Sequence, residues 1–379
     1  MRILIASDKF KGSATGPEVA AALAEGIRSS APGVVIDTAP VADGGEGTLD
    51  AALAAGFEPV TVTVSDPTGA PVSARFAVRG DEALIEMAAA SGLDLLPEGR
   101  RDPGGASSFG TGELIRAALE HGARRIVLGI GGSANTDGGA GMLAALGVSL
   151  RDGEGRPLPG GGAALARLAS IDVSGLDPRL ADTEVVLASD VDNPLLGPRG
   201  AAAVFGPQKG ASPDDVARLD AALAHYAALL ERQPGVRAAT RMGGAGGAGG
   251  VGYAALAVLG ATREPGVEVV QALTGLAERL VGADLVITGE GSLDEQSLGG
   301  KTPLGVAAAA REAGVPVIAV CGRSTLSPEA AAAAGFARVY ALSGIEPDPV
   351  VSMAEAPRLL AETGRRIGAD LGALVAPGR

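Results

Sequence analysis

Tryptophan is absent from this 379-residue sequence, and aromatic residues make up only 2% of it. Hydrophobic residues account for 46%, so a sizeable core is available, built mainly from Ala, Val, Leu and Ile. The only cysteine, Cys321, excludes a disulfide framework and fits a reducing compartment. His121 and His225 lie in helix-like stretches away from the glycine-rich motifs, so neither a histidine-based zinc site nor a Ser–His–Asp triad is expected.

A surplus of basic residues is also missing, since the formal net charge is −13 and no basic stripe occurs. A nucleic-acid-binding surface is therefore not expected. The sequence has no apolar run long enough to span a bilayer, and its start becomes polar at Ser7, unlike a signal peptide. We expect a soluble, cytoplasmic protein of about two domains with no membrane partner.

Strand-like and helix-like segments alternate at both ends of the chain. Apolar runs predict buried strands at residues 3–6, 34–38, 285–288, 315–321 and 337–341. Amphipathic stretches between them predict helices, and this alternation favours an α/β protein with a parallel sheet. We predict a Rossmann-like or flavodoxin-like domain formed by residues 1–75 and 285–379, with a second α/β domain, residues 76–284, inserted into it.

The stretch 283–306 is the most informative part of the sequence. After the predicted strand come Gly289-Glu290-Gly291, then Asp294, then Gly299-Gly300-Lys301, and Pro303 where a helix is expected to begin. A strand, a glycine-opened loop with acids and a lysine, and a helix N-terminus are typical of sites that bind phosphate and a divalent cation. The stretch is not a P-loop, because Glu295 stands where that motif needs glycine.

Lysine is rare, and its positions are informative. Only four of the 31 basic residues are lysines, and all lie near glycine: Lys9, Lys11, Lys209 and Lys301. A compact ammonium group can approach a phosphate or carboxylate where a guanidinium group does not fit. Further polar, glycine-flanked clusters follow predicted strands around Asp43 and Glu46, at 133–137 and at 190–193. With the loop around Lys9 and Lys11 and the stretch 290–301, these make five clusters. Turn formation or helix capping explains any one cluster alone, but five such clusters favour a functional site.

Phosphoryl transfer is the chemistry that requires this mixture of residues. Such an enzyme aligns donor and acceptor, places cations on the γ-phosphate oxygens and holds Mg²⁺ with carboxylates. It also needs a base near the acceptor hydroxyl. Because histidine is not expected in the site, the base is an aspartate or glutamate; Asp190 is the first choice and Asp294 the second.

Seven motifs, in order along nearly the whole chain, together resemble the type I bacterial glycerate kinase family. They are Asp8-x-Phe10-Lys11-x-Ser13, Ala42-Asp43-Gly44-Gly45-Glu46-Gly47-Thr48, Gly110-Thr111-Gly112-Glu113-Leu114-Ile115, Gly131-Gly132-Ser133, Asp137-Gly138-Gly139-Ala140-Gly141-Met142, Phe205-Gly206-Pro207-Gln208-Lys209-Gly210-Ala211 and Ile287-Thr288-Gly289-Glu290-Gly291. The resemblance implies two α/β domains with an active-site cleft between them, ATP and Mg²⁺ as cofactors, and D-glycerate as the substrate, with 2-phosphoglycerate as the usual product. The chain departs from the expected pattern at Ala134-Asn135-Thr136-Asp137, and at Ser292, where relatives often carry a larger, basic residue.

Within that hypothesis each cluster receives a role. The expected catalytic residues are Asp190, Asp294 and Lys301. The expected substrate-binding residues are Lys9, Lys11, Ser13, Asp43, Glu46, Ser133 and Asn135. Lys209, Gly289, Gly291, Gly300 and Lys301 are expected at the ATP phosphates, and Asp190, Asp192 and Glu290 at the metal. The sequence leaves open which cluster binds the nucleotide and which binds the acid.

Two other functions fit the same residues. The first is a kinase for another small hydroxy acid, and the second is a non-catalytic protein that binds an anionic metabolite or a nucleotide. Carboxylates clustered beside lysines favour an enzyme that holds a metal, because a sensor of anions gains nothing from them. Either a monomer or a homodimer is compatible with the sequence.

Overall fold

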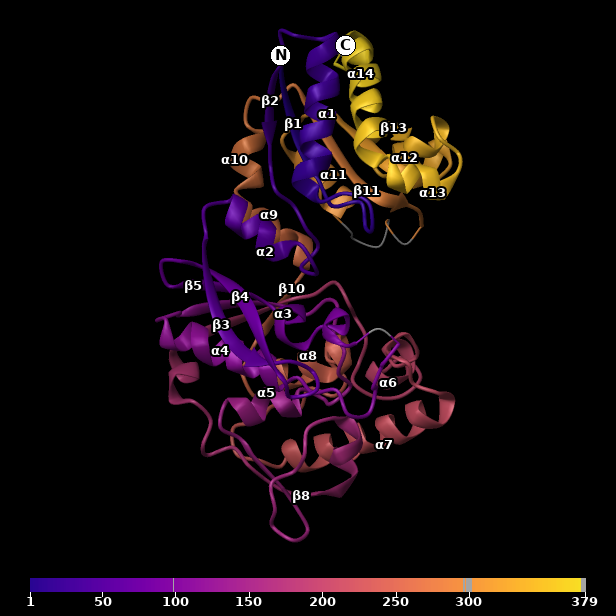
Figure 1. Ribbon diagram of the computed structural model, residues 1–379. Helices are drawn as coiled ribbons and strands as arrows, with labels where there is room; N and C mark the ends of the chain where they lie inside the picture. The colour runs from indigo at the N-terminus through magenta and orange to yellow at the C-terminus, as the bar shows by residue number, and fades with distance from the viewer. Residues whose placement is uncertain (98, 296, 298–301, 376–379) are drawn as a thin grey trace. The chain divides into compact units, whose positions relative to one another are not determined.

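The computed structural model describes residues 1–97, 99–295, 297 and 302–375. The chain forms two compact units (Figure 1). The first unit comprises Met1–Asp43, Asp50–Ala55 and Val267–Arg379, and the second comprises Gly44–Leu49 and Gly56–Gly266. Each unit combines a sheet with helices, and parallel strand pairs predominate, so the predicted α/β class is confirmed.

The first unit is built on a five-stranded sheet in the order β13-β12-β11-β1-β2, and every strand pair is parallel. The strands are β1 (Arg2–Ser7), β2 (Val35–Thr38), β11 (Leu285–Leu293), β12 (Val317–Ser324) and β13 (Phe336–Ala341). The helices are α1 (Gly16–Ser30), α2 (Thr48–Ala54), α9 (Gly266–Thr274), α10 (Leu276–Leu280), α11 (Thr302–Glu312), α12 (Pro328–Ala333), α13 (Pro349–Ala354) and α14 (Ala356–Leu374), with a short 3-10 helix η7 (Leu342–Gly344).

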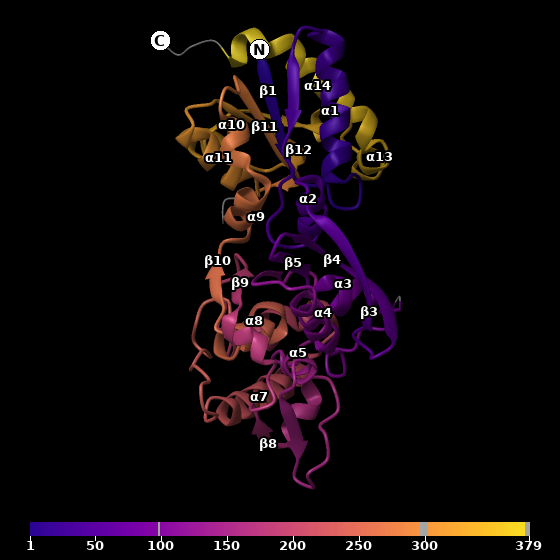
Figure 2. The ribbon, with the colours of Figure 1, turned by 90° about the vertical axis from the view of Figure 1, so that its left-hand side faces the viewer.

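Side-chain alternation along β1 divides the apolar residues of this unit between two cores. Ile3 and Ile5 pack on one face of the sheet with α1 and α14, whereas Leu4 and Ala6 pack on the other face with α10 and α11. The helices α1 and α14 lie side by side over their face (Figures 1 and 2). The result is a sheet with helices on both faces, as a parallel sheet requires.

Local sequence explains where α1 begins. Thr15 accepts a hydrogen bond from the backbone N–H of Glu18, whose carboxylate accepts one from the backbone N–H of Thr15, and Pro17 occupies the first turn. This capping box satisfies backbone N–H groups that have no partner within the helix. Close contact between α1 and α14 depends on glycine, because a Cβ atom on Gly364 would lie 2.3 Å from the carbonyl oxygen of Leu23.

The second unit is built on a six-stranded sheet in the order β10-β9-β6-β5-β4-β3. Its strands are β3 (Glu58–Ser65), β4 (Pro71–Arg79), β5 (Glu82–Glu86), β6 (Arg125–Gly129), β9 (Glu184–Ala188) and β10 (Thr262–Glu264), and β7 (Ser149–Asp152) pairs separately with β8 (Leu168–Asp172). The helices are α3 (Ala88–Ser91), α4 (Phe109–Glu120), α5 (Ala140–Ala145), α6 (Ala201–Phe205), α7 (Pro213–Leu230) and α8 (Val251–Ala257), with the 3-10 helices η1 (Leu93–Leu95), η2 (Gly162–Arg167), η3 (Pro178–Asp182), η4 (Pro207–Lys209) and η5 (Gly247–Gly250).

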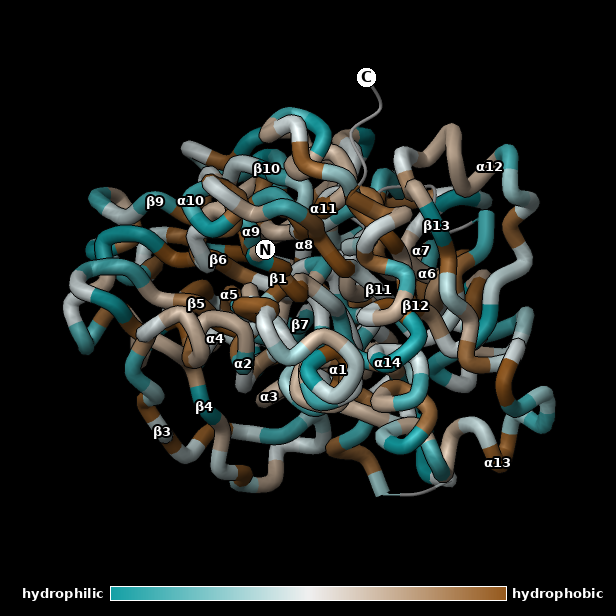
Figure 3. The backbone as a smooth tube through the Cα atoms, turned by 90° about the horizontal axis from the view of Figure 1, so that it is seen from above, coloured by the Kyte–Doolittle hydropathy of each residue, from teal (hydrophilic) through white to brown (hydrophobic). Residues whose placement is uncertain are grey.

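The central strands β5, β6 and β9 are parallel, whereas β3 and β4 form an antiparallel hairpin at the edge of the sheet. One large apolar cluster fills this unit, and Tyr226 and Tyr253 meet edge to face within it, with ring centroids 6.0 Å apart. In Figure 3, hydrophobic residues concentrate along strands such as β1 and β5, and hydrophilic residues in the outer loops.

The limits of the compact units differ from the predicted domain boundaries. The hairpin β3–β4 belongs to the second unit, because β4 pairs with β5 from Ala77↔Leu84 onward. Val270 in α9 packs against Ala42 and Ala51, so most of α9 belongs to the first unit. The division at 75/76 and 284/285 stays a prediction about domains.

None of the helices in the described residues has the length and apolar character needed to cross a membrane.

Candidate active site

The carboxyl-terminal ends of strands in the first unit, with segments that follow them, line a cavity of about 690 Å³. This is the edge at which parallel sheets bind ligands. The cavity brings together six of the residues predicted for ligand or metal binding: Lys9, Lys11, Ser13, Asp43, Glu290 and Gly291. Basic and acidic side chains therefore face one space, as the phosphoryl-transfer hypothesis requires.

Asp8, the first residue after β1, lies in the same lining. Its Oδ1 accepts a hydrogen bond of 2.7 Å from the backbone N–H of Lys9, and its Oδ2 accepts one of 2.7 Å from the Thr302 hydroxyl at the start of α11. Burial, followed by the charge of Asp43, raises the pKa of Asp8 to about 6, although the two hydrogen bonds act in the opposite direction. The carboxylate can thus gain and lose a proton near neutral pH.

The strand β11 is longer than the apolar run predicted. It continues to Leu293, so Gly289, Glu290 and Gly291 lie within a strand rather than in the expected loop. The physical reason is pairing with β12, in which Glu290 lies opposite Cys321 and Ser292 opposite Arg323. Glycine is needed there, because a Cβ atom on Gly289 would lie 2.1 Å from the carbonyl oxygen of Val320.

Three other residues of this stretch that were predicted for the site are not placed in the cavity by the structure. Asp294 closes a turn with Ser297, whose backbone N–H donates to Asp294 Oδ1 at 3.2 Å and whose hydroxyl accepts from the Asp294 N–H at 3.1 Å. Asp294 is not among the residues that line the cavity. Gly300 and Lys301 lie outside the described residues, so their roles stay predictions.

In the second unit the loop after β6 is organised around the buried carboxylate of Asp137. This carboxylate accepts hydrogen bonds from the backbone N–H and hydroxyl of Ser108, the side-chain amide of Asn135 and the backbone N–H groups of Gly139 and Gly141, at 2.8–3.3 Å. The Asn135 side chain also donates to the carbonyl oxygen of Ala248 at 3.1 Å. Asn135 is fully buried, and its predicted contact with substrate stays a prediction.

Lys209 is almost completely buried, which is unusual for a lysine. Its ammonium group donates to the Ser133 hydroxyl at 2.8 Å and to the Asn135 carbonyl oxygen at 2.5 Å. Burial lowers its pKa to about 7. The structure thus brings three predicted residues, Lys209, Ser133 and Asn135, into one interior network.

Asp190 and Asp192 follow β9. Asp190 Oδ1 accepts a hydrogen bond of 3.0 Å from the backbone N–H of Gly266, and Asp192, 72% exposed, pairs with Arg263 at 3.2 Å. The segment that contains Glu46 passes the end of the same strand, where a Cβ atom on Gly44 would lie 3.2 Å from the Ala188 carbonyl oxygen. Asp190 and Glu46 are both exposed residues.

Sequence reasoning assigned no role to Asp8, Asp137 or Thr302. Asp8 carried a usable signal, because it is the acid directly after the first predicted strand. Asp137 precedes Gly138, a pair that is common in turns, and its carboxylate accepts hydrogen bonds from Ser108, far away in sequence. Nothing in the sequence paired Thr302 with Asp8, because 294 positions separate them.

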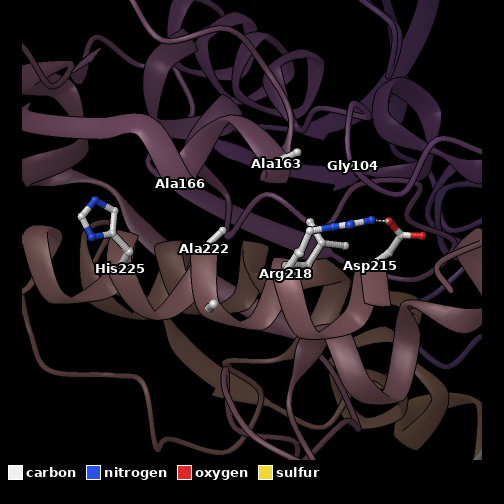
Figure 4. A pocket seen from close by; sticks show the side chains of 9 residues that line it. Gly104, Ala163, Ala166, Asp215, Arg218, Ala222 and His225 are labelled. Atoms are coloured by element: carbon white, nitrogen blue, oxygen red, sulfur yellow. Dashed lines mark hydrogen bonds and ion pairs between the residues drawn. The ribbon is translucent and has the colours of Figure 1, made fainter. Parts of the chain in front are cut away.

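A second cavity, of about 420 Å³, lies in the second unit beside α7 and η2. Alanines and Leu219 form most of its lining. Figure 4 shows Arg218 directed at Asp215, at 2.6 Å, and His225 farther along α7. The His225 Nε2 atom lies 2.7 Å from the carbonyl oxygen of Leu168. Because the cavity is mainly apolar and contains no predicted site residue, it is not a candidate for the chemistry.

Comparison with known proteins identifies relatives along almost the whole chain. A protein-family model described as "Glycerate kinase family" matches residues 3–372. The Glycerate 2-kinase of Escherichia coli K12 is 48% identical over 337 residues, covering 86% of each chain. The Glycerate kinase of Bacillus subtilis 168 is 47% identical over 325 residues, covering 85% of each chain.

A solved structure is similar over nearly its full length. It is a crystal structure of a protein assigned as glycerate kinase 2 from Salmonella typhimurium LT2, 44% identical, covering 98% of both chains with a TM-score of 0.84. The motifs, the α/β fold and these relatives agree, and this protein belongs to the glycerate kinase family.

Proposed function

We propose that this protein phosphorylates D-glycerate with ATP and Mg²⁺, forming 2-phosphoglycerate and ADP. The observation that carries the proposal is the cavity of the first unit, where Lys9 and Lys11 line the same space as Asp8, Asp43 and Glu290. Lysines suit phosphate and carboxylate oxygens, and the acids suit a metal. The names of the relatives support glycerate as the acceptor.

In the proposed reaction an oxygen of the glycerate hydroxyl attacks the γ-phosphorus of ATP in line with the bond to the β-phosphate oxygen. The new O–P bond forms, the bond to ADP breaks, and ADP leaves with its electron pair. Asp190 accepts the hydroxyl proton, and Asp294 is the second candidate for this role. A positioned base contributes about 10²–10⁴-fold to the rate.

Lysines and backbone N–H groups supply the remaining positive charge. We propose that Lys209, Lys301, Gly289, Gly291 and Gly300 bind phosphate oxygens, as electrostatic stabilisation of this reaction requires. For Lys209 the support is indirect, because its ammonium group is hydrogen-bonded to Ser133 and Asn135 inside the protein. Phosphate contact would require these bonds to be exchanged.

The residues of the cavity fit Mg²⁺. Asp8, Asp43 and Glu290 supply only oxygen donors, and Mg²⁺ in such enzymes is bound through one or two carboxylates together with phosphate oxygens and water. Within the described residues, no group of three carboxylate, histidine or cysteine side chains is arranged as a complete metal site. We propose Glu290 as the protein ligand of Mg²⁺ in this cavity, whereas the metal role predicted for Asp190 and Asp192 stays a prediction. When bound, Mg²⁺ neutralises charge on the phosphate oxygens.

Measuring ADP release tests this function against its two alternatives. The purified protein is incubated with ATP and Mg²⁺ and with D-glycerate, tartronate or lactate. We expect kcat/KM to be higher for D-glycerate than for tartronate or lactate. A higher value for another acid would indicate a different hydroxy-acid kinase, and thermal stabilisation by ligands without ADP release would indicate a binding protein.

A further inference from the structure

The lining of the 690 Å³ cavity has two chemically different parts. The charged part comes from the loop after β1 and from β11 and includes Lys9, Lys11 and Glu290. The more apolar part comes from η7, α13 and the segment that joins them. It includes Leu342, Pro347 and Met353, beside the polar residues Ser343, Glu346 and Ser352. A ligand that fills the cavity therefore carries both charge and a substantial apolar surface.

The cavity is larger than glycerate alone needs. A water molecule takes about 30 Å³ in the liquid, so an acid with seven non-hydrogen atoms needs at most about 200 Å³. Cavities of about 300–1,000 Å³ hold ligands of the size of drugs and cofactors. A nucleotide belongs to this class of ligands, and it has an apolar base at one end and phosphates at the other.

Met353 connects the two parts of the lining. It is 48% exposed, and its Cε atom lies 3.1 Å from where a Cβ atom on Gly12 would be, so its thioether reaches the loop after β1. Met353 belongs to the cavity lining, so its side chain is available to a ligand there. Methionine sulfur also packs favourably against aromatic rings, such as a purine.

We propose that this cavity binds the nucleotide, with the purine against the wall formed by Leu342, Pro347 and Met353 and the phosphates toward Lys9 and Lys11. The inference rests on the proposed ATP-dependent function and makes it more specific. It moves Lys9 and Lys11 from the acid, where the sequence placed them, to the phosphates. Gly291, predicted at the phosphates from the sequence, lies in the same lining.

The absence of tryptophan from the chain permits a direct test. In Met353→Trp the introduced indole is the only one, and it replaces a half-exposed side chain. The matched control is Val350→Trp on the same helix, which is 76% exposed and outside the cavity lining. We expect ADP and ATP to change the emission of Met353→Trp saturably, D-glycerate to leave it unchanged, and neither to change Val350→Trp.

A change with D-glycerate but not with nucleotide would overturn the proposal, as would a change of equal size in the control. Met353→Ala gives an independent readout and avoids a bulky side chain in the cavity. We expect its KM for ATP to rise about three- to tenfold, with the KM for D-glycerate unchanged. An unchanged KM for ATP together with an unresponsive Met353→Trp would also contradict it.

The fluorescence titration requires no turnover, so the two proposals can fail separately. If the unmodified protein forms no phosphoglycerate while nucleotide still saturates Met353→Trp, the glycerate kinase function is wrong and the nucleotide site stands. If phosphoglycerate forms and only D-glycerate changes the emission, the function stands and the site assignment is wrong.

Discussion

The hydroxyl of Thr302 donates a hydrogen bond of 2.7 Å to Asp8 Oδ2, which joins the first residue of α11 to the first residue after β1. The bond holds a carboxylate in a partly buried position beside the charge of Asp43. Burial and repulsion outweigh the hydrogen bond, so the Asp8 pKa rises from 3.8 to about 6. A carboxylate that is unfavourable for folding is retained at the candidate active site, as is common at functional sites.

Asp8→Asn should stabilise the protein at pH 7. Ionised Asp8 costs folding free energy above its folded-state pKa, and this cost disappears when it is protonated in both states, below about pH 4. A shift of about two pKa units corresponds to at most about 3 kcal/mol. The gain should appear in urea unfolding with EDTA present, and it should shrink as the pH falls from 6 to 4.

The control for that experiment is Asp37→Asn. Asp37 pairs with Arg2 at the surface of the same sheet, at 2.6 Å, so its loss should cost at most about 1 kcal/mol and should give no gain at pH 7. Equal stability of Asp8→Asn and the unmodified protein at pH 7 would contradict the raised pKa.

Lys209→Met should change the pH dependence of stability in the sense opposite to that expected for Asp8→Asn. The pKa of Lys209 is about 7 in the folded state against 10.5 for a free lysine, so the unfolded chain binds the additional proton between these values. The free energy of unfolding of the unmodified protein should therefore rise with pH above about 7, relative to the variant. Urea unfolding between about pH 7 and 9 measures this.

Lys11→Met is the control for the buried lysine, because Lys11 is exposed. The stability difference between this variant and the unmodified protein should stay constant over the same pH range. If the free energies of unfolding of Lys209→Met and the unmodified protein changed with pH by the same amount, Lys209 would stay charged in the interior, against the prediction.

Asp137→Asn should destabilise the second unit. The substitution replaces one acceptor oxygen by an amide N–H₂ group among five donors, and buried hydrogen bonds to a charged group are worth about 1.5–3 kcal/mol each. We expect a loss of about 2–5 kcal/mol in urea unfolding. Asp172→Asn, at an exposed carboxylate that accepts from the Ser174 N–H, should lose less than about 1 kcal/mol.

Two glycines of α14 should respond to alanine with opposite signs. In Gly364→Ala the new Cβ atom would lie 2.3 Å from the backbone oxygen of Leu23 in α1, which should cost about 1–3 kcal/mol or more. In Gly372→Ala the Cβ atom meets nothing within 4 Å, and the helix should gain up to about 1 kcal/mol. A loss of similar size in both variants would contradict the close packing of α1 and α14.

Local signals predicted the regular elements well, whereas residues distant in sequence decided the details of the site. The start of α1 follows from Thr15, Pro17 and Glu18, which are neighbours in the chain. The burial of Lys209 depends on Ser133 and the loop after β6, and single-residue chemistry favours an exposed lysine. No local pattern contains that information.

Glycines illustrate the same limit. Residues 244–250 have a composition compatible with either a mobile loop or a close-packing turn. The structure buries this segment, with the backbone N–H of Gly138 donating to the carbonyl oxygen of Gly249. Likewise, the glycines at 289 and 291 were expected to open a loop but lie in β11, because pairing with β12 continues past them.

Phosphorus NMR of the products formed from D-glycerate, ATP and Mg²⁺ tests the proposed function most directly, because one spectrum reports both transfer and the position of the new phosphate. We expect resonances of ADP and 2-phosphoglycerate that grow together. A spectrum in which ATP stays intact, or yields ADP with inorganic phosphate alone, would contradict it.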